Sequence, residues 1–94
     1  MDQNSDDFYR RLKHELEKST SWPSEYLFKF IVTTDRSKID VIQDLFDGLG
    51  AVIKTQQSKN GKYTSLSINV RMQSADQVIK KYREVSVVKG VISL

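Results

Sequence analysis

The sequence of 94 residues predicts one α+β domain in which two helices cover one face of a four-stranded antiparallel sheet. Three observations lead to this fold class. The run from Ser65 to Met72 alternates strictly between polar and apolar residues. Asn60-Gly61 separates it from an earlier strand-like run. Two further segments carry apolar residues at helical spacing.

The first predicted strand, Glu25 to Thr34, is rich in aromatic and β-branched residues. Because side chains alternate between the two faces of a strand, this one has an aromatic core face and a mixed second face. The core face carries Tyr26, Phe28, Phe30 and Val32, and the second face carries Leu27, Lys29, Ile31 and Thr33.

Two helices are predicted to pack on the core face of the sheet. The first is capped by Asp35 or Ser37 and runs to about Asp47, where Gly48 and Gly50 end it. The second follows the capping box Ser74-Ala75-Asp76-Gln77. Its apolar stripe consists of Ala75, Val78, Ile79, Tyr82 and Val85.

The remaining strands complete the order β-α-β-β-α-β. Ala51 to Lys59 is a second strand, and Asn60-Gly61 predicts a type I′ hairpin turn, in which both central residues have positive φ. The alternating run is the third strand, and Val88 to Leu94 is the fourth. This is the ferredoxin-like arrangement. An additional helix, Asp6 to Lys18, precedes it, so we expect an N-terminal helical extension over residues 1–21 and a domain over residues 22–94.

Composition excludes several classes of protein. The sequence has no Cys, so disulfides and thiolate metal sites are ruled out. No apolar run reaches the roughly 20 residues of a membrane-spanning helix, and the acidic N-terminus does not resemble a secretory signal. We therefore expect a cytoplasmic protein without membrane contact. Its net charge of +3 is small for a nucleic-acid-binding protein.

Catalytic and phosphate-binding motifs are not recognisable. His14, the single His, lies among charged surface residues of the first helix, so we expect no enzyme. Asn60-Gly61-Lys62 is not a P-loop, because Gln56 replaces the first Gly, Tyr63 replaces the Ser or Thr after the Lys, and a strand follows. Asp40, Asp44 and Asp47 share one side of a helix, where a solvated polar surface is the simpler interpretation than a cation site. We expect no cofactor and no metal.

The second face of the sheet raises two questions. Lys29, Lys54, Lys62 and Arg71 would give it a basic surface, but base stacking needs aromatic side chains, and only Tyr63 is available. Specific nucleic-acid binding is therefore disfavoured, and weak nucleic-acid binding remains the alternative function. Leu27 and Ile31 on the same face call for a cover. The candidates are the N-terminal helix through Phe8, Leu12 and Leu16, a second copy in a homodimer, or a partner protein.

Several segments from Trp22 to Leu94 resemble the YbeD-like family of small bacterial proteins, often labelled lipoate regulatory proteins. The matching pieces are "WPSEYLFKFIV", "SKNGKYTSLSINV" and "SADQVIKKYREVSVVKGVISL". The resemblance implies a ferredoxin-like domain similar to the ACT regulatory domains, which bind small effectors. Many relatives carry Cys where this sequence has Ser24, and ACT domains usually have a Gly in the loop that here reads "TTDRSKID". The missing Gly argues against an amino-acid effector.

Taken together, these patterns predict a non-enzymatic regulatory or interaction module that binds a partner protein or a small effector. The candidate binding residues lie on the second face of the sheet and in the loop after the first strand. They are Lys29, Asp35, Arg36, Ser37, Lys62, Tyr63 and Arg71.

Overall fold

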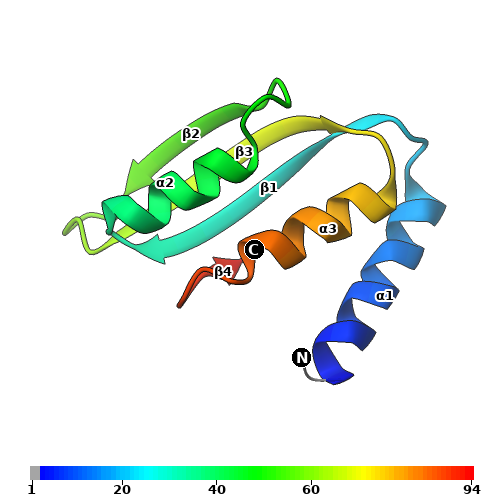
Figure 1. Cartoon of the computed structure of the whole chain (residues 1–94), viewed down its shortest axis with the longest axis horizontal. Helices are drawn as coiled ribbons and strands as arrows, with labels where there is room; N and C mark the ends of the chain where they lie inside the picture. Colours follow the sequence, from blue (N-terminus) through cyan, green and yellow to red (C-terminus); the bar gives the residue numbers. More distant parts are fainter. Residues whose placement is uncertain (1–2) are drawn as a thin grey trace.

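The computed structural model of the chain describes residues 3–94 (Figure 1). The elements are α1 (Gln3–Ser19), β1 (Ser24–Thr33), α2 (Arg36–Leu45), β2 (Val52–Gln57), β3 (Tyr63–Met72), α3 (Ala75–Val85) and β4 (Ile92–Ser93). The strands lie in the order β2-β3-β1-β4, and every neighbouring pair is antiparallel. The predicted ferredoxin-like α+β arrangement, preceded by a helix, is confirmed.

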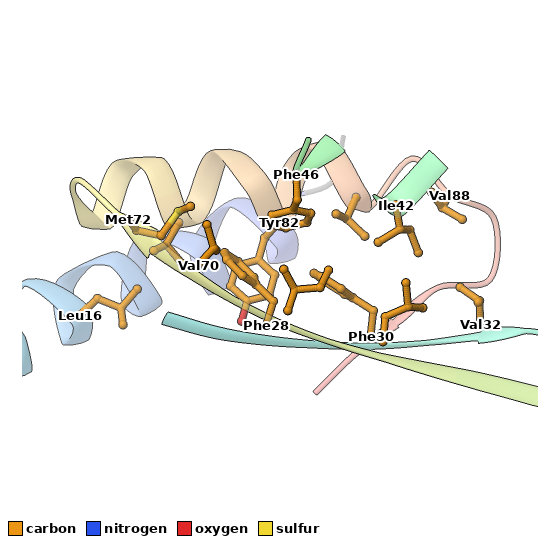
Figure 2. Close-up of a cluster of buried hydrophobic side chains, with 14 of the residues drawn as sticks. Leu16, Phe28, Phe30, Val32, Ile42, Phe46, Val70, Met72, Tyr82 and Val88 are labelled. Atoms are coloured by element: carbon orange, nitrogen blue, oxygen red, sulfur yellow. The ribbon is translucent and has the colours of Figure 1, made fainter. Parts of the chain in front are cut away.

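The register of the sheet follows from the alternation in the sequence. β1 and β3 pair along their full lengths, from Ser24 opposite Met72 to Thr33 opposite Tyr63. β2 continues the same rows, with Ile53 opposite Ile68. Because paired residues point to the same face, the apolar positions of all three strands converge on the side covered by α2 and α3. Figure 2 shows these side chains between the strands and the helices.

An aromatic cluster forms the centre of this core. Phe28 is fully buried, and its ring lies 5.1 Å from the ring of Phe46 in α2 and 5.1 Å from that of Tyr82 in α3. Tyr26 lies 4.8 Å from Phe28, and its hydroxyl is hydrogen-bonded to that of Tyr82 at 2.9 Å. One strand residue therefore contacts both covering helices (Figure 2).

Both predicted helix starts are confirmed. Asp35 caps α2, and its carboxylate accepts a hydrogen bond from the backbone N–H of Ser37. Ser74 caps α3 by accepting from the N–H of Gln77 at 3.1 Å. The reciprocal bond differs from a standard capping box, because the side-chain oxygen of Gln77 accepts from the N–H of Gln73, one residue before the cap.

Two local predictions are wrong. Gly61 has a φ of 75°, but within residues 3–94 only Gly residues have a positive φ, so Asn60-Gly61 does not form a type I′ turn. A longer loop closes instead, with the N–H of Gly61 bonded to the carbonyl of Ser58. The fourth strand is also much shorter than Val88 to Leu94. Val88 bonds back to Val85, and Gly90 turns the chain with a φ of 78°, which leaves only Ile92–Ser93 in the sheet.

Helix α1 packs beside α3 on the helix-covered side, so it does not cover the second face of the sheet (Figure 1). Leu16 reaches the core, Tyr9 and Leu12 pack against it, and ion pairs also join the helix to α3. Lys13 Nζ lies 2.8 Å from Asp76 Oδ1, and this hydrogen bond raises the pKa of Lys13. Arg83 pairs with Asp6 at 3.1 Å and lies over the ring of Tyr9. The proposed internal cover is therefore excluded.

Lys81 joins the two covering helices through polar contacts that the apolar stripe of α3 did not predict. Its ammonium donates to the carbonyl of Leu45 in the last turn of α2 at 2.5 Å. The same group lies 2.9 Å from Glu84 Oε1 and 5.4 Å from the centre of the Phe46 ring. The side chain of Lys81 is only 14% exposed, so this ammonium group has little water around it.

We predict that Phe28→Ala lowers the free energy of unfolding by about 3–5 kcal/mol, the usual cost of removing a buried aromatic ring. Phe28→Leu, which fills more of the space, should cost less. Urea denaturation followed by circular dichroism measures both values. A loss under about 1 kcal/mol for the alanine variant would contradict a central role for this ring.

We further predict that Lys81→Ala lowers the free energy of unfolding by about 2 kcal/mol, because it leaves the carbonyl of Leu45 without its donor and the carboxylate of Glu84 without its ion-pair partner. The neighbouring Lys80 is exposed, so Lys80→Ala is the matched control and should change stability by less than about 0.5 kcal/mol. Equal losses in the two variants would show that the Lys81 contacts contribute nothing.

Candidate functional site

The sheet surface opposite α2 and α3, called the open face below, is the candidate site. By register it consists of Glu25, Leu27, Lys29, Ile31, Thr33, Val52, Lys54, Gln56, Tyr63, Ser65, Ser67, Asn69, Arg71 and Ile92. Leu27, Val52 and Ile92 are 56%, 60% and 53% exposed, which is unusual for large apolar side chains. This face therefore combines accessible apolar side chains with charged ones.

The charges of the open face are mainly positive. Lys29 and Lys54 both lie opposite Ser67, one on each side, so the two lysines share a row across the centre of the sheet. Both are exposed. Arg71 also lies on this face, but Glu25 stands directly opposite it on β1. The two lysines consequently carry most of the uncompensated charge.

One end of the open face is hollowed. The hollow has a volume of about 210 Å³ and is lined by residues of β1, β2, β3 and the loop of residues 58–62 that joins β2 to β3 in a hairpin. The lining residues include Ile31, Gln56, Ser58, Tyr63 and Ser65. Lys62 lies at the same end, with its ammonium 5.4 Å from the centre of the Tyr63 ring. Ile31 and the Tyr63 ring make the surface of the hollow mainly apolar, with polar groups of Gln56, Ser58 and Ser65 at its walls.

The loop after β1 uses its polar groups internally. The carboxylate of Asp35 accepts from the N–H of Ser37 at 2.9 Å and from its hydroxyl at 2.7 Å. These bonds lower the pKa of Asp35, the hydroxyl contributing most. Arg36 pairs with Asp40 one turn along the helix at 3.2 Å. The loop therefore acts as a helix cap and has no convergent set of unoccupied donors.

The structure brings together only some of the seven candidate binding residues. The N–H of Thr34 bonds to the carbonyl of Lys62 at 2.9 Å, which places the Asp35–Ser37 loop next to the hairpin with Lys62 and Tyr63. Lys29 lies four residues from Thr33 along β1, about 13 Å at the usual rise of a strand. Arg71 lies eight residues from Tyr63 along β3, about 26 Å. The seven residues do not form one compact pocket.

Several residues near or on the open face were not predicted as site residues, among them Leu27 and Lys54. Val52 and Ile92 belong to it by register, and Lys38 reaches the end of β1, where its ammonium donates to the hydroxyl of Thr33 at 3.1 Å. Alternation alone could have placed Val52 there, opposite Asn69. Ile92 could not be placed, because the length of the turn before β4 sets its register.

Catalytic chemistry finds no support in the described part of the chain. His14 is exposed on α1. Within residues 3–94, no group of three or more His, Cys, Asp or Glu residues is placed to hold a metal ion. Burial and the hydrogen bond to Tyr26 raise the pKa of Tyr82, which belongs to the core.

Comparison with known families gives one match. A family model described as "Protein of unknown function (DUF493)" matches residues 17–94, which includes the whole sheet together with α2 and α3. The chain belongs to this family. The YbeD-like resemblance is thereby confirmed, since DUF493 is the YbeD-like family. Most of α1 lies outside the DUF493 match. Searches of the curated proteins and of the solved structures gave no significant match.

None of the helices in residues 3–94 is long and apolar enough to cross a membrane.

We predict that Ser37→Ala moves the pKa of Asp35 up towards the ordinary value of about 3.9 for an Asp side chain. The hydroxyl bond is the largest cause of the lowered pKa, whereas the backbone N–H remains in the variant. Because the pKa of Asp35 is lower in the folded state than in the unfolded state, its carboxylate stabilises the folded state at pH values above the unfolded pKa. This stabilisation is lost as the pH falls through the folded pKa.

An NMR titration of the Asp35 carboxyl in both proteins measures the shift, with Ser24→Ala, at the opposite end of β1, as the control at a distant hydroxyl. Identical midpoints in the wild type and the Ser37→Ala variant would contradict the assigned cause.

Proposed function

We propose that this protein is a non-enzymatic interaction module whose open face binds an acidic surface of a partner protein. The observation that carries the proposal is the juxtaposition of exposed Leu27, Val52 and Ile92 with the lysine row of Lys29 and Lys54. Exposed apolar side chains gathered on one face are typical of protein interaction sites. Lysines among them favour a partner with carboxylates at matching positions.

Two other functions fit the same face less well. Nucleic-acid bases need aromatic rings on which to stack, and the open face offers only Tyr63, at one end, away from the lysine row. A small effector has the hollow beside Tyr63, but the Asp35–Ser37 loop next to it has its polar groups satisfied. A partner protein uses the apolar and the basic side chains together.

The proposed role is regulatory, in the cytoplasm, and acts by binding and not by catalysis. The label given to many YbeD-like proteins connects them with lipoate regulation. Proteins of lipoate metabolism are therefore the first partners to test.

We predict that a photoreactive amino acid placed at Leu27 crosslinks to a partner protein in cells, whereas the same group placed at Val87 does not. Val87 is 78% exposed and lies on the turn after α3, so it is a matched apolar control. The double variant Lys29→Glu, Lys54→Glu should lose the product, because the charges that attract an acidic surface are reversed. Mass spectrometry identifies the product.

Three results would contradict the proposal. They are a Leu27 product no stronger than that from Val87, a product that survives the double charge reversal, and a crosslink to RNA or DNA. The last would favour the nucleic-acid alternative.

A further inference from the structure

The outer edge of β1 is largely unpaired. β1 runs from Ser24 to Thr33, but β4 pairs only with Phe30 and Ile31. The N–H of Leu94 adds one bond to the carbonyl of Lys29 at 2.9 Å. Nothing in residues 3–94 continues the ladder towards Ser24. Residues 24–28 of β1 therefore lie at an open edge of the sheet, whereas the segment that pairs with β4 is interior.

The direction of the backbone groups along this edge follows from the bond at Lys29. In an antiparallel ladder, the N–H and C=O of one residue point to the same neighbour, and successive residues alternate. Because Lys29 points towards β4, Leu27 and Glu25 point the same way, and Tyr26 and Phe28 point towards β3. Within the described residues, no backbone group pairs with the N–H or C=O of Leu27.

An aromatic hollow lies beside this open edge, on the helix-covered side. It has a volume of about 200 Å³. Its walls include Phe8 and Leu12 of α1, Tyr26 of β1, Tyr82 of α3 and Ser93 of β4. Phe8 remains 55% exposed, so an apolar ring is held at the rim without being covered. A closed apolar cavity of about 150 Å³ can hold a benzene molecule, so this hollow has room for one large apolar side chain.

The edge and the hollow are aligned with one another. Ser93 lies opposite Phe30 and lines the hollow. A strand that continued the register of β4 would place its next helix-side residues opposite Phe28 and Tyr26, where the same hollow lies. Its intervening residue would lie opposite Leu27 and could exchange two backbone hydrogen bonds with it. An extended chain therefore satisfies both features at once.

We propose that an extended peptide segment of a partner protein binds here as an added strand, antiparallel to β1 and in line with β4. Main-chain bonds to Leu27 would supply affinity. Of two apolar side chains at positions i and i+2, the one opposite Tyr26 would enter the hollow and the one opposite Phe28 would lie next to Ser93 at its wall. This is the strand-addition mode of peptide recognition. Glu25 is exposed next to the far end of the added strand, which favours a basic residue there. The hollow lies on the side of the sheet opposite the open face, while Glu25 and Leu27 border both sites.

The β2 edge of a second copy does not supply such a segment, because its helix-side residues are Ile53, Thr55 and Gln57. Only the first of these is apolar, so the second apolar side chain at position i+2 is missing. Pairing the β2 edge of one copy with the β1 edge of another would also join unlike surfaces, which gives rings or open chains and not two-fold dimers.

The test uses the full chain and the peptide acetyl-Leu-Thr-Phe-Lys-Thr-amide, designed so that Leu and Phe lie opposite Phe28 and Tyr26. NMR titration should move the amide signals of Glu25 and Leu27. Methylating the peptide nitrogen of the residue opposite Leu27 should weaken binding on the order of tenfold, since both bonds to Leu27 are disturbed. Methylating the nitrogen of the Phe residue, which points away from β1, should leave binding unchanged.

Protein variants separate this site from the open face. Phe8→Ala should weaken binding on the order of fivefold or more, as for an aromatic contact at an interface. Tyr63→Ala, which removes an exposed ring from the open face, should have no effect. The proposal is overturned by an absence of binding, by equal effects of the two methylations, or by binding that depends on Tyr63. It is also overturned if light scattering shows a dimer and the NMR amide shifts that accompany dimerisation lie on the outer edge of β1.

Discussion

The contact of Phe28 with Phe46 and Tyr82 is the interaction on which the rest of the structure depends. It holds α2 and α3 on one face of the sheet, and a domain of this size has apolar mass for only one such layer. Everything on the other face is consequently left to water or to a partner. The exposed Leu27, Val52 and Ile92 follow from this division and are not faults in packing.

Charge placement follows the same division. Within the covered side, the ammonium of Lys81 is held by a helix-end carbonyl and a carboxylate, so its charge is compensated at short range. Lys29 and Lys54, at the centre of the open face, lie on either side of Ser67, and no carboxylate stands opposite them in the sheet. One class of lysine therefore stabilises the fold, and the other is available for recognition. The two classes differ in environment and not in residue type.

The sequence predicted those features that depend on local patterns. The alternation from Ser65 to Met72 determines which face each side chain takes, and the caps at Asp35 and Ser74 determine where two helices begin. Features set by longer-range contacts were not predictable. The length of β4 depends on how many residues form the turn at Gly90. The position of α1 depends on ion pairs with α3. The candidate site residues were chosen by chemistry, so their separation along the strands emerged only from the structure.

Helix α1 is held unevenly along its length. Leu16 enters the core and Leu12 and Tyr9 pack against it, whereas the first turns are joined to Arg83 by an ion pair from Asp6 and a cation–π contact from Tyr9. Partly exposed ion pairs stabilise weakly and are screened by salt, while buried apolar contacts are not. The helix should therefore open from its first turns, in a graded way that ionic strength controls. The salt concentration of the solution would then control the order of the segment that carries Phe8.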